Sequence, residues 1–300
     1  MARRILINKN VKVSLEQAVE EYLEECRDRK LSPQTLKTYE QLKNLYKLLP
    51  VMEISFLDEQ CIKDFLTAFR ETHNYSDSSI NNLIRYIKTF LKWCVQKDYL
   101  EKEPKVSYLK VPSKIQEVPT TVEVKRLLVR PNLHHTSYNS FAGWLITSII
   151  VATGLRINAI SQLKRDDIDL KNNVLTVREN KGGKTHRIVI VKKLKDDLKF
   201  FIEHTEEHEY LFANNKGIPY TGHTLSMVLV RYANSLGIDT SPHCLRRFFA
   251  TEYIKNGGNI VTLSRLLLHS DLSITQKYLE KLTIQDMSEE IFECNPLSRL

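Results

Sequence analysis

Several polar side chains in the second half of the sequence are not explained by apolar periodicity and have the chemistry to hold an anion. Arg156 directly follows an apolar helical run that ends at Gly154. Because a guanidinium stays charged, its place beside a core helix implies a specific anionic partner. His243 and Arg246 are spaced i, i+3, so both project from one face near the start of a helix, where unpaired N–H groups also favour an anion.

A candidate nucleophile follows these cations along the chain. His269 precedes Tyr278 by nine residues, and Ser270 or Asp271 can cap a final helix that carries the tyrosine. Taken singly, each of these residues has an ordinary structural explanation: an arginine in a salt bridge, a satisfied histidine, a half-buried tyrosine. Only their combination favours a site.

The elements that must position these residues belong to a mixed second domain. A helix capped at Thr120 or Thr121 opens it, and a buried helix over 141–153 ends at Gly154, where a glycine can take the left-handed conformation. Two strands, 174–177 and 186–191, flank a lysine- and glycine-rich tip and predict a β-hairpin. Further helices are expected from about Lys193 and after Gly222, Pro242, Gly258 and Ser270.

The first hundred residues predict four short amphipathic helices that share one core. Ser14 and Gln17 form a capping box, Ser32-Pro33 starts a second helix that runs to Leu49, and Asp58 caps a third. A fourth helix carries apolar positions from Ile80 to Cys94. Prolines then punctuate a polar stretch, so we expect a helical domain over 1–100, a linker over 101–118 and a second domain over 119–300.

Composition narrows the class of partner. The net charge of +8 and the pI of about 9.1 favour a polyanion, although a basic, solvated surface gives the same numbers. Five widely spaced cysteines without a C-x-x-C pair indicate reduced thiols in a cytoplasmic protein. His204 and His208 lack the glutamate of a zinc H-E-x-x-H motif. No apolar run approaches the ~20 residues of a membrane span, and no signal peptide is apparent.

Together these motifs resemble the tyrosine recombinase (phage integrase) family, over roughly residues 14 to 285. The match consists of Ala-Thr-Gly-Leu-Arg156, the hairpin lysine Lys181, the His243-x-x-Arg246 box, His269 and Tyr278, in that order. The resemblance implies a mainly α fold with a small β-hairpin or sheet: a SAM-like helical core-binding domain and an α+β catalytic domain that close as a C-shaped clamp on DNA. The length looks most like compact Xer-type members.

The resemblance implies a role for each matched residue in site-specific strand exchange. Two guanidiniums, Arg156 and Arg246, suit the non-bridging oxygens of a phosphodiester, where negative charge grows during attack. Tyr278 is the nucleophile, and His243 is its base or a transition-state hydrogen-bond donor. The remaining roles are Lys181 as general acid with Lys184 as the alternative, and His269 as a donor to phosphate. The product is a 3′-phosphotyrosine with a free 5′-hydroxyl, so neither metal nor ATP is expected.

The sequence departs from the family pattern at three positions. Ala159 stands where the family usually carries Glu or Asp, and Asn158, Asp166 or Asp167 are possible substitutes. Leu268 replaces a common glycine before the histidine, and Arg247 replaces a common second histidine.

The expected partner is double-stranded DNA with a specific recombination site. On the fourth helix, Asn81, Arg85, Lys88 and Lys92 form one polar stripe, which suits either a major groove or a solvated face. The resemblance favours DNA contact by this stripe and implies that the second helix also approaches the major groove. The expected DNA contacts are Lys37, Arg85, Lys88, Lys92 and Lys184.

Assembly is expected as a dimer on one site and a tetramer in the synapse, with accessory factors possible. Ile284, Met287 and Ile291 are spaced for a tail helix that packs on its own domain or on a neighbouring protomer. A nucleoid-associated integrase, excisionase or resolvase of a mobile element is the expected role. The alternatives are a catalytically impaired architectural protein and a type IB topoisomerase.

Overall fold

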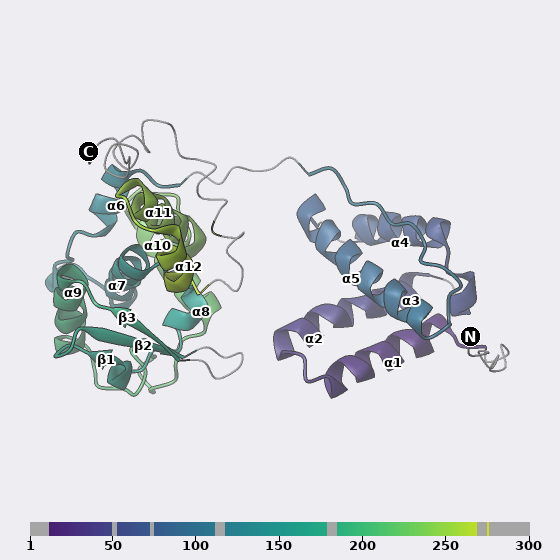
Figure 1. The fold of residues 1–300 in the computed structure, drawn as a ribbon, viewed down its shortest axis with the longest axis horizontal. Coiled ribbons are helices and arrows are strands. Elements are labelled where there is room, and N and C mark those ends of the chain that lie inside the picture. Colours follow the sequence, from purple (N-terminus) through teal and green to yellow (C-terminus); the bar gives the residue numbers. More distant parts are fainter. Residues whose placement is uncertain are drawn as a thin grey trace, which may run out of the picture. The chain divides into compact units, whose positions relative to one another are not determined.

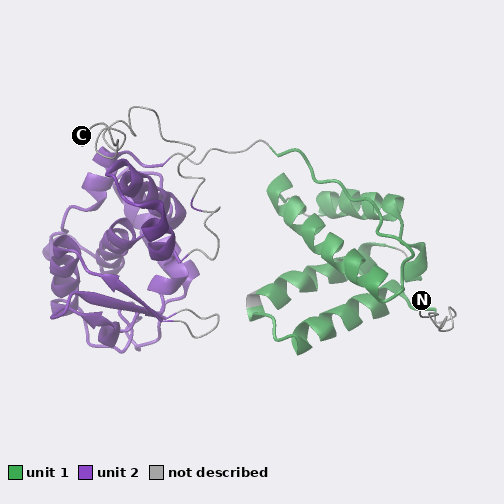
Figure 2. Cartoon of the chain, in the orientation of Figure 1, with its two compact units in different colours: residues 1–114 green, residues 115–300 purple. Residues whose placement is uncertain are grey.

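The chain is described by a computed structural model that covers residues 12–49, 53–72, 75–111, 118–178, 185–268 and 275. It divides into two compact units, residues 1–114 and 115–300 (Figure 2). The expected class, mainly α with a small antiparallel sheet, is confirmed. In the described part of the chain, no helix is long and apolar enough to cross a membrane.

The first unit is a helical bundle, as predicted (Figure 1). Ser14 caps the first helix and forms the expected box with Gln17, and Asp58 accepts a hydrogen bond from the backbone N–H of Cys61. Aromatic side chains of the first and last helices, Tyr22 and Trp93, pack edge to face in the core. The helices are α1 (Leu15–Asp28), α2 (Pro33–Tyr39), α3 (Lys43–Leu48), α4 (Glu59–Thr72) and α5 (Asp77–Gln96).

The predicted second helix is divided in two. A 3₁₀ turn at Glu40–Leu42 separates α2 from α3. Its tighter winding turns the chain by about 20° more per residue than an α-helix does. Leu42, the last residue of this turn, and Leu45 are both fully buried. Leu42 lies on the apolar stripe expected of a continuous helix, whereas Leu45 lies off that stripe and is nevertheless on the core.

The segment that follows α5 packs on the first unit. Val106 is buried and Leu109 is partly buried against the core of the bundle. The side chain of Asn81 exchanges two hydrogen bonds with the backbone of Leu109, at 2.9 and 2.8 Å. The Nζ of Lys88 donates to the carbonyl of Val106 at 3.2 Å. The prolines thus mark a stretch that, up to residue 111, is held by the bundle.

The second unit is built around one apolar helix, α7 (Tyr138–Thr153), whose Trp144 is fully buried. Thr120, one of the two predicted caps, begins the preceding helix, and it also forms a capping box with Glu123. The other helices are α6 (Thr121–Leu127), α8 (Ile157–Ile160), α9 (Lys192–Glu203), α10 (Gly222–Ser235), α11 (Pro242–Lys255) and α12 (Ile260–Leu266).

A three-stranded antiparallel sheet completes this unit (Figure 1). Its order is β1 (Ile168–Asp169), β2 (Val174–Arg178) and β3 (Thr185–Val189), and Val177 pairs with His186. The hairpin strands were predicted, whereas β1 and α8 were not. β1 has two residues and α8 has four, and such short segments show no periodic pattern of apolar residues.

Acid should weaken the first unit through Glu20 of α1. Lys43 and Tyr46 both donate to its carboxylate, and the bond from Lys43 is the main reason that the pKa of Glu20 lies below its ordinary value. A depressed carboxyl pKa stabilises the fold above the unfolded pKa of about 4.3, and this contribution is lost as the pH falls through the folded pKa. Glu20→Gln should therefore lower the free energy of unfolding at pH 7 and have little effect at pH 3.

The measurement is urea unfolding followed by Trp93 fluorescence in a Trp144→Phe background. Glu24→Gln, at an exposed position of the same helix, is the control. An equal loss at both pH values would contradict the assignment.

Candidate active site

Arg156 leaves the core at the end of α7. Gly154 takes the left-handed conformation with a φ of +67°, and its N–H donates to the carbonyl of Ile150. A Cβ at this position would lie 2.4 Å from Phe249 and 2.8 Å from Leu267. Only glycine satisfies both the backbone angle and this close packing. The chain then buries Leu155 and exposes Arg156, directly after the helix end that the sequence predicted at Gly154.

Helix α11 carries the second pair of predicted residues. Ser241 caps it by accepting from the N–H of Cys244, and Pro242 occupies the first helical position. His243 is exposed in the first turn, whereas Arg246 is only 5% exposed. Although the two residues share the face that their i, i+3 spacing predicts, the histidine lies at the surface and the arginine in the interior.

The two arginines meet at one backbone carbonyl. Arg246 donates through Nη1 to Gly154 and through Nη2 to Leu267, both at 2.7 Å. Arg156 donates through Nη1 to the carbonyls of Leu267 and Leu268, both at 3.2 Å. Gly154 and Leu267 are the C-terminal caps of α7 and α12, where the helix dipole is negative. These carbonyls let two like charges lie close together.

The turn after α12, which supplies the carbonyls of Leu267 and Leu268, has an unusual backbone. Leu268 has a φ of 51°, in the left-handed region, which costs an L-residue about 1–2 kcal/mol. Its side chain packs against the core of the second unit, and this contact offsets part of the cost. The geometry explains physically why a glycine would suit this position.

Four predicted residues lie outside the described residues: Lys181, Lys184, His269 and Tyr278. Strand β2 ends at Arg178 and strand β3 begins at Thr185, so the predicted lysine tip lies between them in the sequence. His269 is the next residue in sequence after Leu268. The roles of all four stay predictions.

The position where the family usually carries Glu or Asp is here an alanine in apolar surroundings. Ala159 is partly buried against the core of the second unit. Asp167 is buried and pairs with Arg178, and it also accepts from the backbone N–H of Lys164. The side-chain oxygen of Asn158 lies against Gly222. Among the expected substitutes, Asp167 and Asn158 thus have other neighbours, and Asp166 is exposed. Arg247 is partly exposed.

The predicted DNA contacts of the first unit differ in their surroundings. Lys37 of α2 is exposed, as are Arg85 and Lys92 of α5. The guanidinium of Arg85 donates to the hydroxyl of Tyr86 at 3.1 Å. Lys88 is only partly exposed because it contacts the carbonyl of Val106. Sequence reasoning missed this second use of the stripe, since nothing in the sequence links α5 to residue 106.

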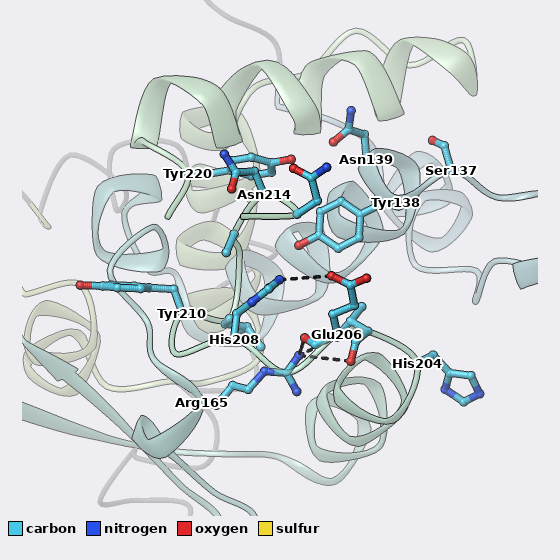
Figure 3. A pocket seen from close by; sticks show the side chains of 14 residues that line it. Ser137, Tyr138, Asn139, Arg165, His204, Glu206, His208, Tyr210, Asn214 and Tyr220 are labelled. Carbon is cyan, nitrogen blue, oxygen red and sulfur yellow. Dashed lines mark hydrogen bonds and ion pairs between the residues drawn. The ribbon is translucent and has the colours of Figure 1, made fainter. Parts of the chain in front are cut away.

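A cavity of about 510 Å³ opens elsewhere on the second unit (Figure 3). Tyr138 and Tyr220 line it, and the Nη2 of Arg165 donates to the hydroxyl of Thr205 at 2.9 Å. Tyr138 begins α7, whereas Arg156 follows the other end of that 16-residue helix. At 1.5 Å per residue the two ends lie about 24 Å apart. The cavity is therefore not the place where the arginines meet.

Comparison with known proteins links this chain to one family. The model of the phage integrase family matches residues 120–283. The tyrosine recombinase XerA of Thermococcus kodakarensis is 31% identical over 228 residues, which cover 74% of this chain and 77% of the relative.

Solved structures show the same fold at lower identity. The Tn1549 transposon integrase in complex with circular intermediate DNA has a TM-score of 0.72 at 20% identity, covering 91% of this chain and 98% of that one. A lambda integrase tetramer bound to a Holliday junction has a TM-score of 0.73 at 17% identity, covering 90% and 78%.

Gly154→Ala should destabilise the second unit by about 2–5 kcal/mol, because left-handed strain adds to overpacking against Phe249 and Leu267. Gly237→Ala is the matched control: its φ is +69°, but nothing lies within 4 Å of the added Cβ. It should cost only the strain of about 1–2 kcal/mol. Urea unfolding measures both, and equal losses would show that the close packing at Gly154 contributes nothing.

Arg246→Lys should cost about 1–3 kcal/mol, because a single ammonium does not reproduce the planar fork whose two Nη atoms bond Gly154 and Leu267, and one carbonyl loses its donor. Arg156→Lys, at an exposed position, should cost less than about 1 kcal/mol. Thermal unfolding of both variants checks this order. The reverse order would contradict the hydrogen bonds assigned to Arg246.

Proposed function

Because this chain belongs to the phage integrase family and is a tyrosine-type site-specific DNA recombinase, we propose that it cuts and rejoins DNA through Tyr278, with Arg156 and Arg246 on the scissile phosphate. The convergence of the two arginines on the carbonyl of Leu267 is the observation that carries this proposal. Within the described residues, both hydrogen bonds of Arg156 start from Nη1, so Nε and Nη2 can face an anion.

The attack builds negative charge on the non-bridging oxygens of the phosphate. Guanidiniums whose positions are fixed before DNA arrives stabilise that charge with little reorganisation. Arg246 is held on two sides and buried, which suits a fixed electrostatic partner. Arg156 is exposed, which suits direct bidentate contact with the phosphate.

The proton balance assigns the other groups. A phenol holds its proton at neutral pH, so Tyr278 must lose its proton as its oxygen bonds to phosphorus. His243, exposed at the start of α11, takes that proton or donates to the transition state. The bond to the 5′-oxygen breaks, and Lys181, or Lys184 in its place, protonates the leaving oxygen. His269 donates to a non-bridging oxygen.

The 3′-phosphotyrosine keeps the energy of the phosphodiester. Attack by the 5′-hydroxyl of a second strand therefore restores the DNA backbone and frees Tyr278 without ATP. We propose a specific DNA site bound by a dimer and a tetramer in the synapse, supported by the fold shared with the lambda integrase tetramer on a Holliday junction. Integration or excision of a mobile element and resolution of DNA both fit this chemistry, and accessory factors would set direction.

A second candidate function is favoured by Ala159. No described carboxylate takes the place of the family's acid beside Arg156, since Asp167 pairs with Arg178. A protein with the same fold that binds DNA and cleaves it poorly would serve an architectural role.

Tyr278→Phe tests the proposal. The wild type, incubated with nicked suicide duplexes drawn from its own genomic flanks, should form a covalent protein–DNA adduct on a denaturing gel. The variant should bind the same DNA and form none, because phenylalanine has no oxygen to attack phosphorus. Tyr253→Phe, a tyrosine of α11, is the control and should keep the adduct.

An adduct in Tyr278→Phe would show that another residue is the nucleophile. Tight binding by all three proteins without an adduct would establish the architectural function instead.

A further inference from the structure

Residues 105–111, here called the strap, lie against α5 as part of the first unit. The chain turns back after α5, and the strap runs antiparallel to it: Val106 is held at Lys88, and Leu109 is held two helical turns earlier, at Asn81. Val106 is 8% exposed, so the strap contributes to the core of the bundle.

Asn81 holds the strap as a strand neighbour would. Its Nδ2 donates to the carbonyl of Leu109 at 2.9 Å, and its Oδ1 accepts the N–H of Leu109 at 2.8 Å. Both backbone groups of one residue are thereby satisfied by one side chain. Asn81 therefore fixes the position of the strap. It also fixes Lys105 and Lys110, which lie next to Val106 and Leu109 in the sequence.

The strap brings two lysines to the stripe on α5. Lys105 and Lys110 are exposed, and the ammonium of Lys88 lies 4.9 Å from the centre of the Tyr108 ring. In the described part of the chain, no ion pair with a carboxylate involves any cation of this cationic face, which consists of Arg85, Lys88, Lys92, Lys105 and Lys110.

Several cations elsewhere on the bundle are paired with carboxylates. Lys43 pairs with Glu20 at 2.8 Å, and Lys97 pairs with Glu25 at 3.1 Å. Those glutamates belong to α1, whose surface a polyanion would avoid. Lys37 and Lys47 of α2 and α3 also form no ion pair among the described residues, but α5 and the strap together present five such cations, which can attract phosphates.

We propose that the strap is part of the surface that binds the DNA backbone, that Lys105 and Lys110 contact phosphates, and that Asn81 is the positioning residue that holds them there. The inference rests on the proposed function, because it takes DNA as the partner. It explains why Asn81 and Lys88 share a face of α5 with Arg85 and Lys92.

Salt dependence of binding tests this proposal. The probe is a fluorescein-labelled duplex of random sequence, titrated with the full chain at increasing KCl. Each phosphate contact adds about 0.9 to the slope of log K against log salt. The double variant Lys105→Gln/Lys110→Gln should therefore lower the slope by about 1.8.

Asn81→Ala should lower the slope by a similar amount although it changes no charge, because the released strap no longer presents its lysines. Added to the double lysine variant, it should lower the slope no further. Asn82→Ala is the matched control: it removes the same side chain from the neighbouring, exposed position of α5 and should leave the slope unchanged. Leu109→Pro removes the N–H from the strap side without touching α5, and should act like Asn81→Ala.

The rate of trypsin cleavage after Lys105 and Lys110, measured without DNA, reports whether the strap is held against α5. Asn81→Ala and Leu109→Pro should raise this rate several-fold, and Asn82→Ala should not. An unchanged rate overturns the positioning role of Asn81. A faster rate with an unchanged salt slope overturns the DNA contact by the strap. A wild type whose binding does not depend on salt contradicts the proposed function itself, which separates the two failures.

Discussion

One backbone carbonyl, that of Leu267, organises the candidate active site. It accepts hydrogen bonds from Arg156 and from Arg246, which come from different parts of the second unit. Two guanidiniums repel each other unless negative charge lies between them, and here the C-terminal ends of α7 and α12 provide it. Under the proposed function, a phosphate that enters this site meets donors whose positions are already fixed.

Two features of the surrounding backbone place these carbonyls at the arginines. Gly154 allows α7 to end against Phe249 and Leu267, which brings its carbonyl to Arg246. The left-handed turn at Leu268 directs a further carbonyl to Arg156. Since His269 is the next residue in the chain, the segment that carries the predicted histidine and tyrosine begins where the arginines are held. Ala159 fits the same view, because backbone groups now orient the arginines that a carboxylate usually supports.

Much of this could be predicted from the sequence, and the rest depends on contacts that leave no local pattern. The caps at Ser14, Asp58 and Thr120 and the end of α7 at Gly154 follow from residue types at fixed spacings. The role of Leu267 could not be predicted, since every residue has a carbonyl and only tertiary packing selects one. The docking of residues 105–111 was missed for the same reason: Asn81 and Lys88 have the same spacing as a solvated stripe. The second predicted helix was wrong as one continuous element: a 3₁₀ turn interrupts it, and Leu45, off the predicted apolar stripe, is fully buried.

The shared carbonyl of Leu267 can be measured directly by NMR. The sequence contains four Leu–Leu peptide bonds, one of which joins residues 267 and 268. Labelling with carbonyl-¹³C and amide-¹⁵N leucine therefore isolates this bond among four cross-peaks, and the peak that joins residues 127 and 128 serves as an internal reference. We predict that Arg246→Lys and Arg156→Lys each shift the ¹³C resonance of the Leu267 carbonyl upfield and leave the reference in place. If the resonance moves in only one variant, or in neither, the two arginines do not share this carbonyl and the account is wrong.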